Sequence, residues 1–208
     1  MDARPEPGAE FNSGPATVPR VAATVIVLRG ERDDLEVLLV QRTPHARFMG
    51  GAWVFPGGAV SPEDGDGDAA LLTAGIRELE EEAGIRVSGP DELVPFSRWI
   101  TPEEVKIRFD TWFFLARLPD GAEPRVDGEE VVDARWYTPA AALDAGRADE
   151  ILLVFPTVKH LEQLSGFGSA AELLDHARTR TVRPVQPRVV GSGEQARILL
   201  PGEPGYDD

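Results

Sequence analysis

Apolar and polar residues alternate along this chain in blocks that predict strands and helices in turn. Runs rich in β-branched and aromatic residues predict strands over 21–28, 35–41, 93–100, 105–116 and 131–137. Helical spacing and capping residues predict helices over 140–145, 155–164 and 169–180. Because strands and helices interleave, we expect an α/β protein whose mixed sheet lies between layers of helices.

One further amphipathic helix is predicted from Asp68, a good N-cap, to Gly84, where a left-handed residue would end it. Its core face is expected to carry Leu72, Ile76, Leu79 and Ala83. An adjacent face, within about 100°, carries Glu78, Glu81 and Glu82, whereas Glu80 points away.

The glutamate face is unfavourable by itself. Like charges at spacings of three and four residues repel, and the end of a helix disfavours anions, each at about 0.3–1 kcal/mol. Two interpretations follow: a solvated acidic surface, or a site where a divalent cation binds the carboxylates. A short strand, Trp53–Val60, breaks at Pro56-Gly57-Gly58, so its backbone can approach the glutamates closely and add a carbonyl ligand.

Gly58 and the later run resemble the signature of the Nudix hydrolases. That run is Arg77-Glu78-Leu79-Glu80-Glu81-Glu82-Ala83-Gly84-Ile85, and it matches the second half of the signature at every specified position. The first half departs from the pattern: Asp64 stands where a glutamate is expected, and twelve residues, not seven, separate it from Arg77. The extra residues also resemble the start of a calcium-binding EF-hand loop, but Ala69 and Gly75 replace its required glycine and glutamate.

The resemblance implies a Nudix-type α/β/α sandwich and hydrolysis of a diphosphate in a nucleoside diphosphate derivative. It implies Mg²⁺ or Mn²⁺ as cofactor, and catalytic roles for the helix residues Glu81 and Glu82. The implied metal ligands are Glu78, Glu81, Glu82 and the Gly57 carbonyl, and the implied structural residues are Arg77, Asp64 and Gly84. A further glutamate from a loop is expected as base or ligand: Glu129 or Glu130, with Glu103 or Glu104 as the fallback.

Substrate contacts are predicted upstream of the helix. Arg42 and Arg47 are candidates for phosphate binding, together with Gly58, whereas His45 is expected to be a surface residue. Weak similarity to the coenzyme A diphosphatase branch favours coenzyme A or acyl-coenzyme A, then ADP-ribose, for which Pro102 lies near the expected position. The alternative is a non-catalytic, nucleotide-sensing Nudix fold, although such proteins usually lose motif glutamates.

Composition narrows the class of protein. The 208 residues include no cysteine and carry a formal net charge of −15, which argues against a nucleic-acid or anionic-membrane surface. Neither a signal peptide nor a membrane-spanning run is predicted, so a cytoplasmic location and a small-molecule partner are expected. We expect a lead-in over 1–19, one domain over 20–180 and a Pro/Gly-rich tail over 181–208, with a homodimer as a further candidate.

Overall fold

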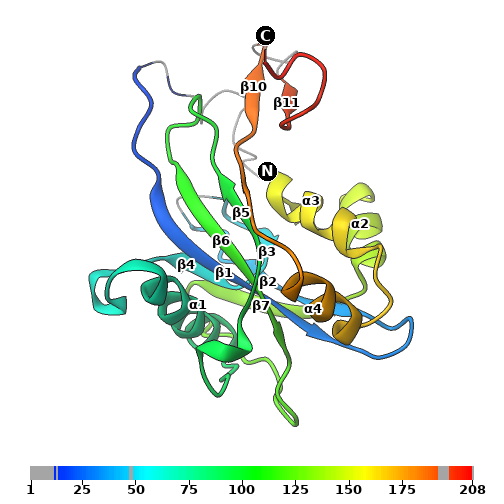
Figure 1. Cartoon of the computed structure of the whole chain (residues 1–208). Helices are drawn as coiled ribbons and strands as arrows, with labels where there is room; N and C mark the ends of the chain where they lie inside the picture. Colours follow the sequence, from blue (N-terminus) through cyan, green and yellow to red (C-terminus); the bar gives the residue numbers. More distant parts are fainter. Residues whose placement is uncertain (1–11, 13, 47–48, 192–196, 208) are drawn as a thin grey trace.

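A computed structural model describes residues 12, 14–46, 49–191 and 197–207 (Figure 1). Its strands are β1 (Arg20–Arg29), β2 (Glu36–Arg42), β3 (Ala52–Val54), β4 (Gly57–Ala59), β5 (Val94–Ile100), β6 (Phe109–Arg117), β7 (Val131–Tyr137), β8 (Leu152–Leu153), β9 (Pro184–Val185), β10 (Arg188–Val190) and β11 (Arg197–Leu199). Its α-helices are α1 (Gly67–Ala83), α2 (Pro139–Arg147), α3 (Phe155–Leu164) and α4 (Ala170–Arg178).

The main sheet has nine strands and mixed directions. Its path runs β8-β3-β2-β1-β6-β5-β9, with β4 added to β1 and β7 added to β2. The pairs β1–β6, β3–β8 and β5–β9 are parallel, and the other pairs are antiparallel. Strands β1 and β2 pair only next to their connecting turn, so they diverge beyond it and β4 enters beside β1.

Helices cover both faces of the sheet, with α1 on one side and α2, α3 and α4 on the other (Figure 1). Successive side chains of β1 point to opposite faces of the sheet, and each face is buried under helices. Val25 and Val27 belong to the core under α1, whereas Ile26 and Leu28 belong to the core under the other helices. The expected α/β/α sandwich with a mixed sheet is therefore confirmed.

Helix α1 differs from the prediction in its start and in its buried face. It begins at Gly67, after the N-cap Asp66, and ends at Gly84, whose φ is 65°. Of the expected core residues, Leu79 and Ala83 are buried, but Leu72 and Ile76 are only partly buried. The buried set is shifted around the helix and is Ala70, Leu71, Ala74, Gly75, Leu79, Glu82 and Ala83. Glu82, one of the motif glutamates, therefore lies on the buried face of α1 and not on its solvent face.

The predicted strand 105–116 begins later, at Phe109. Arg108 is buried there, because its guanidinium donates to the carbonyls of Thr101 and Thr17. These bonds tie the chain before β1 to the turn between β5 and β6. That turn also contacts the C-terminal part of the chain, through the Val189 N–H and the Glu104 carboxylate, 3.5 Å apart.

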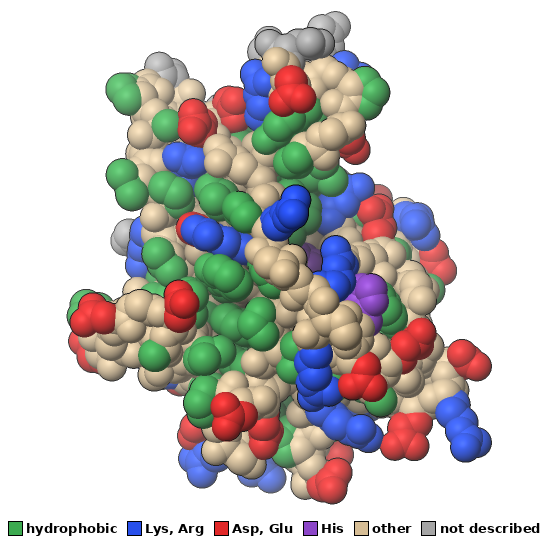
Figure 2. Space-filling model, in the orientation of Figure 1, with side chains coloured by type: hydrophobic (Ala, Val, Ile, Leu, Met, Phe, Trp, Pro, Cys, Tyr) green, Lys and Arg blue, Asp and Glu red, His purple; other side chains and the backbone are tan. Residues whose placement is uncertain are grey.

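The segment after residue 180 adds β9 to the edge of β5 and then forms the separate β10–β11 hairpin. Figure 1 shows this hairpin at the end of the molecule where β1 begins. On the face in Figure 2, acidic and basic side chains are interspersed over α2, α3 and α4. Within the described ranges, no helix combines the length and the apolar character needed to cross a bilayer.

Candidate functional site

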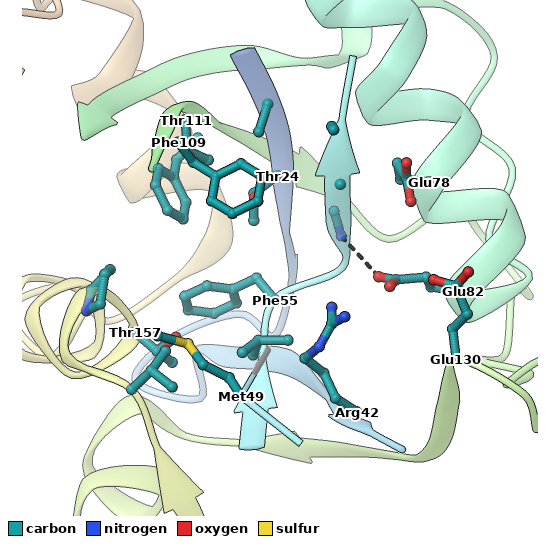
Figure 3. A pocket seen from close by; sticks show the side chains of 18 of the residues that line it. Thr24, Arg42, Met49, Phe55, Glu78, Glu82, Phe109, Thr111, Glu130 and Thr157 are labelled. Atoms are coloured by element: carbon teal, nitrogen blue, oxygen red, sulfur yellow. Dashed lines mark hydrogen bonds between the residues drawn. The ribbon is translucent and has the colours of Figure 1, made fainter. Parts of the chain in front are cut away.

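A cavity of about 620 Å³ opens between the start of the β1–β6 pair, the glycine turn, α1 and the start of α3. It is lined by Arg20, Ala22, Thr24, Arg42, Met49, Val54, Phe55, Gly57, Gly58, Ala59, Ser61, Arg77, Glu78, Glu82, Phe109, Thr111, Phe113, Glu130, Val154, Pro156 and Thr157. Figure 3 shows its two walls: glutamates on the side of α1, and aromatic side chains towards α3.

The floor of the cavity continues a core face of the sheet. Alternate residues of a strand share a face, so Ala22 and Thr24 lie on the same side of β1 as Ile26 and Leu28. Helix α3 begins only at Phe155, and this part of the sheet remains accessible as a cavity. The register of β1 with β6 then defines three rows of the floor: Arg20 with Phe109, Ala22 with Thr111, and Thr24 with Phe113.

The glycine turn brings β4 against two glutamates of α1. The Gly57 N–H donates to Glu82 Oε2 at 2.9 Å. A β-carbon at Gly58 would collide with the Glu78 carboxylate, and one at Gly57 would collide with the backbone of β1 at Thr24. Gly57 therefore needs glycine because the backbone of β1 lies too close for any side chain, whereas a side chain at Gly58 would displace the Glu78 carboxylate. The close approach expected from the sequence is observed.

Burial gives Glu82 an unusual environment. Its residue is only 4% exposed, and desolvation raises its pKa to about 7 against the opposing bond from Gly57. Glu78 and Glu130 add like charge, whereas Arg42 opposes it. Desolvation also raises the pKa of Glu78, despite its bond with Arg77. A cavity that holds several carboxylates in partial burial favours bound positive charge.

Arg77 organises the turn and the helix together. Its Nε and Nη2 donate to the two oxygens of Asp64, both at 2.9 Å, and Nη1 donates to Glu78 at 2.8 Å and to Glu81 at 3.0 Å. A weaker bond of 3.3 Å reaches the Ala59 carbonyl of β4. These bonds lower the pKa of Asp64 to about 2. The shorter aspartate therefore reaches the arginine from a 3₁₀ turn, Pro62–Asp64, within the inserted loop.

The structure separates the three motif glutamates. Glu78 and Glu82 line the cavity, but the Glu81 side chain is 58% exposed and bonds only to Arg77 within the described part of the chain. Among the described residues, no three His, Asp or Glu side chains are already gathered as a metal cage. The donor set nevertheless suits a hard cation, because the partly buried Glu78 and the buried Glu82 line the cavity together with Glu130.

The candidate glutamates from loops outside the helix lie in different places. Glu129 and Glu130 are both exposed, but only Glu130 lines the cavity. Asp127 explains this turn, because its carboxylate accepts from the backbone N–H groups of Glu130 and Val131. Glu104 contacts Val189 at the far end of the sheet.

The basic candidates upstream of the glycine turn also separate. Arg42 points into the cavity (Figure 3), with its buried Nε lacking a protein partner among the described residues. Arg47 lies outside the described residues, and His45 is exposed and does not line the cavity.

The aromatic wall was not predicted as part of the site. Phe109 and Phe113 come from β6, and Phe55 directly follows β3. Thr157 of α3 completes the wall, which Figure 3 shows with Phe55 and Phe109. Because Phe109 and Phe113 are four residues apart on one strand, alternation predicts that they share a face, but a single sequence does not tell which helix would leave that face uncovered.

Behind the aromatic wall lies His160, which is fully buried. Its ring centroid is 4.1 Å from that of Phe113. Nδ1 lies 2.7 Å from the Pro156 carbonyl, and Nε2 lies 2.6 Å from the Ser97 hydroxyl. The carbonyl can only accept, so Nδ1 carries the proton and Nε2 accepts from Ser97. Burial lowers the pKa of His160 to about 4, which keeps this ring neutral and structural.

Comparison with known proteins gives consistent matches. The model of the NUDIX domain matches residues 18–155. The putative nudix hydrolase 7 of Caenorhabditis elegans is 28% identical over 182 residues, 70% of this chain and 60% of that protein. Human acyl-coenzyme A diphosphatase NUDT19 is 29% identical over 116 residues, 53% of this chain and 31% of that protein. The matched region therefore covers less than two thirds of the length of either relative.

A solved structure agrees with the fold over a longer stretch. The crystal structure of a NUDIX hydrolase from Alicyclobacillus acidocaldarius superposes with a TM-score of 0.68 and 28% identity. The match covers 80% of this chain and 98% of that one. It extends beyond the matched domain model, so the arrangement that follows residue 155 is included in part.

Proposed function

We propose a diphosphatase activity for this chain, which belongs to the Nudix family. The reaction is hydrolysis of a diphosphate linkage in a nucleoside diphosphate derivative, with Mg²⁺ or Mn²⁺ as cofactor. The observation that carries the proposal is the convergence of Glu78, Glu82 and Glu130 on one cavity that also contains Arg42. A diphosphate carries several negative charges, so a cavity lined by carboxylates can bind it only when a cation lies between the carboxylates and the phosphate oxygens.

Glu78 and Glu82 are the proposed core of the metal site, with Glu81 and the Gly57 carbonyl as further ligands. When bound, such a cation neutralises phosphate oxygens and acidifies water. The protein supplies the orientation: the Gly57 N–H restrains one oxygen of Glu82, and Arg77 restrains Glu78. Glu81 contributes if it exchanges its exposed bond with Arg77 for the cation, an exchange that costs little because surface ion pairs contribute about 0–1 kcal/mol.

Glu130 is the proposed general base or additional ligand, in preference to Glu129. Its place in the cavity lining supports this choice, as does the turn that Asp127 stabilises through two backbone bonds. A base held on a short, hydrogen-bonded turn next to β7 can take a proton from water facing Glu82. Arg42 is proposed to bind a phosphate oxygen, because its guanidinium points into the cavity and its Nε is unpartnered there.

The proposed substrate is coenzyme A or an acyl-coenzyme A, followed by ADP-ribose. Two features support a substrate with a large group beyond the diphosphate: the cavity volume of about 620 Å³ and the aromatic wall opposite the glutamates. The partial match to a human acyl-coenzyme A diphosphatase supports the same class.

A substrate panel tests the proposal. Purified protein with Mg²⁺ or Mn²⁺ is incubated with coenzyme A, an acyl-coenzyme A, ADP-ribose, NADH and diadenosine polyphosphates, and the products are identified by mass. Cleavage within the diphosphate of at least one compound, lost on chelation with EDTA, is the expected result. Tight binding of a nucleotide without turnover would instead identify a sensor and refute the diphosphatase activity.

A further inference from the structure

The outermost row of the cavity floor combines a free cationic group with an aromatic ring. Arg20 and Phe109 are register partners on β1 and β6, and both line the cavity. The Arg20 guanidinium carbon lies 5.8 Å from the centroid of the Phe109 ring. A guanidinium above an aromatic ring presents its remaining N–H groups outwards, where they can bind an anion.

The charges of this chain make that arginine unusual. Many of its surface arginines are paired with carboxylates, as expected for a net charge of −15. Of the three arginines that line the cavity, Arg77 is surrounded by carboxylates. Within the described ranges, neither Arg20 nor Arg42 forms an ion pair. The cavity therefore holds two arginines whose charge is available to a ligand.

Strand geometry separates Arg20 from the end of the floor that lies beside the glutamates. Thr24 pairs with Gly57, whose N–H contacts Glu82, so this row marks the catalytic end of the floor. Arg20 lies four residues earlier on the same strand, which is about 13 Å at 3.3 Å per residue. Between the ends lies the neutral row of Ala22 and Thr111.

We propose that Arg20, supported by Phe109, is a specificity-determining residue that binds a phosphate on the ribose of the substrate. The inference rests on the proposed function, because the diphosphate is taken to lie at Glu78 and Glu82. A ribose phosphate and a 5′-diphosphate are two anionic groups separated by one neutral sugar. The floor has the same order: acidic, cation-binding end, neutral row, arginine.

A longer linear phosphate chain fits this order less well. Its inner phosphates would lie opposite Ala22 and Thr111, which offer no positive charge. The base of a nucleotide gains from Phe109 by stacking, but stacking alone does not need Arg20. The combination of a ring and an unpaired guanidinium favours a nucleotide with a phosphorylated ribose.

The first experiment measures selectivity with a matched pair of substrates. Coenzyme A and 3′-dephospho-coenzyme A contain the same diphosphate and differ by the ribose phosphate alone. Wild-type kcat/KM should favour coenzyme A by about tenfold, the effect of one charge-assisted contact. Arg20→Gln should abolish this preference, and Arg20→Lys should retain part of it.

Arg117→Gln is the matched control, because Arg117 lies at the opposite end of the same β1–β6 pair and is exposed. It removes the same charge from the same strands and should leave the preference unchanged. A wild-type enzyme without the preference overturns the inference. So does a preference that survives Arg20→Gln, or one that Arg117→Gln removes equally.

A binding measurement separates this inference from the proposed activity. Adenosine 3′,5′-bisphosphate and AMP are titrated by calorimetry into the protein without added metal. The bisphosphate should bind about tenfold more tightly than AMP to the wild-type protein. The Arg20→Gln variant should bind both ligands with equal affinity. If no diphosphate is hydrolysed but this difference is found, the proposed function fails and the Arg20 site stands. Equal binding of both ligands to wild-type protein refutes the site even if hydrolysis is observed.

Discussion

Glu82 and His160 are both buried ionisable residues, with 4% and 1% of their surface exposed, but their surroundings differ. His160 has a partner for each ring nitrogen and lies among aromatic rings. Glu82 has one backbone donor within the described part of the chain and faces other carboxylates. The first side chain is satisfied in the neutral form, and the second is not satisfied without an added positive group.

This contrast separates a structural buried group from a functional one. A satisfied neutral group needs nothing from solvent, so it stabilises one packing arrangement. A carboxylate that is desolvated beside like charges is costly unless it binds a cation or a proton. Glu82 lines the cavity, whereas His160 lies behind its aromatic wall. Variants of Glu82 should therefore affect activity, and variants of His160 should affect stability.

The largest expected effect is that of Glu82→Gln on activity. Glutamine keeps an acceptor for the Gly57 N–H but removes the charge that a cation needs. We expect kcat to fall more than about 100-fold, with the melting temperature unchanged or raised because like-charge repulsion is relieved. Steady-state rates with the best diphosphate from the panel, together with thermal unfolding, provide the measurement. Near-normal rates would show that Glu82 is not a metal ligand.

The next effect compares two neighbours, Glu130→Gln and Glu129→Gln. Removal of a base or extra ligand at Glu130 should lower kcat by about 10-fold to 100-fold. Glu129 is exposed outside the cavity lining, so its variant serves as the control and should stay within about twofold of wild type. The pair is measured at several pH values with the same substrate. Equal losses, or a loss for Glu129 alone, would contradict the assignment.

The smallest expected effect concerns stability, not turnover. His160 has a folded pKa of about 4, below its ordinary 6.5. As the pH falls from about 6.5 to 4, the unfolded chain binds the proton first, so stability is lost in that window. Unfolding free energy should be about 2 kcal/mol lower at pH 5 than at pH 7 from this residue alone.

Urea unfolding at the two pH values measures this loss, and two variants isolate the contribution of His160. His160→Gln should be less stable at pH 7 and show a correspondingly weaker dependence on pH. His45→Gln, at an exposed histidine, should keep the wild-type dependence. If all three proteins lose the same free energy on acidification, the buried histidine is not the source.

Much of the fold could be predicted from local patterns. The strands β1 and β2, the capped starts of α2 and α4, and the stop of α1 at Gly84 are confirmed. Each depends on residues within one or two turns of the chain. The predicted starts of α1 and β6 were wrong by a few residues. Before β6, Arg108 donates to the Thr17 carbonyl, a partner distant in sequence that local patterns do not reveal.

The candidate site divides in the same way. Helical spacing placed Glu78, Glu81 and Glu82 near one another, and the glycine pair predicted the close backbone approach. The depth of each glutamate was not predictable, because the surface that buries Glu82 comes from β4. The choice of Glu130 over Glu129 likewise depends on how Asp127 folds the turn before β7.

The sequence by itself determined the amphipathic helix, its acidic face and the sharp glycine turn, since these follow from residue type and local spacing. Three features depend on the tertiary fold: which carboxylate is desolvated, which aromatic side chains form the opposite wall, and how far Arg20 lies from the glutamates. The reason is that burial and separation depend on strands and helices brought together from distant parts of the chain, whereas periodicity is a property of each segment alone.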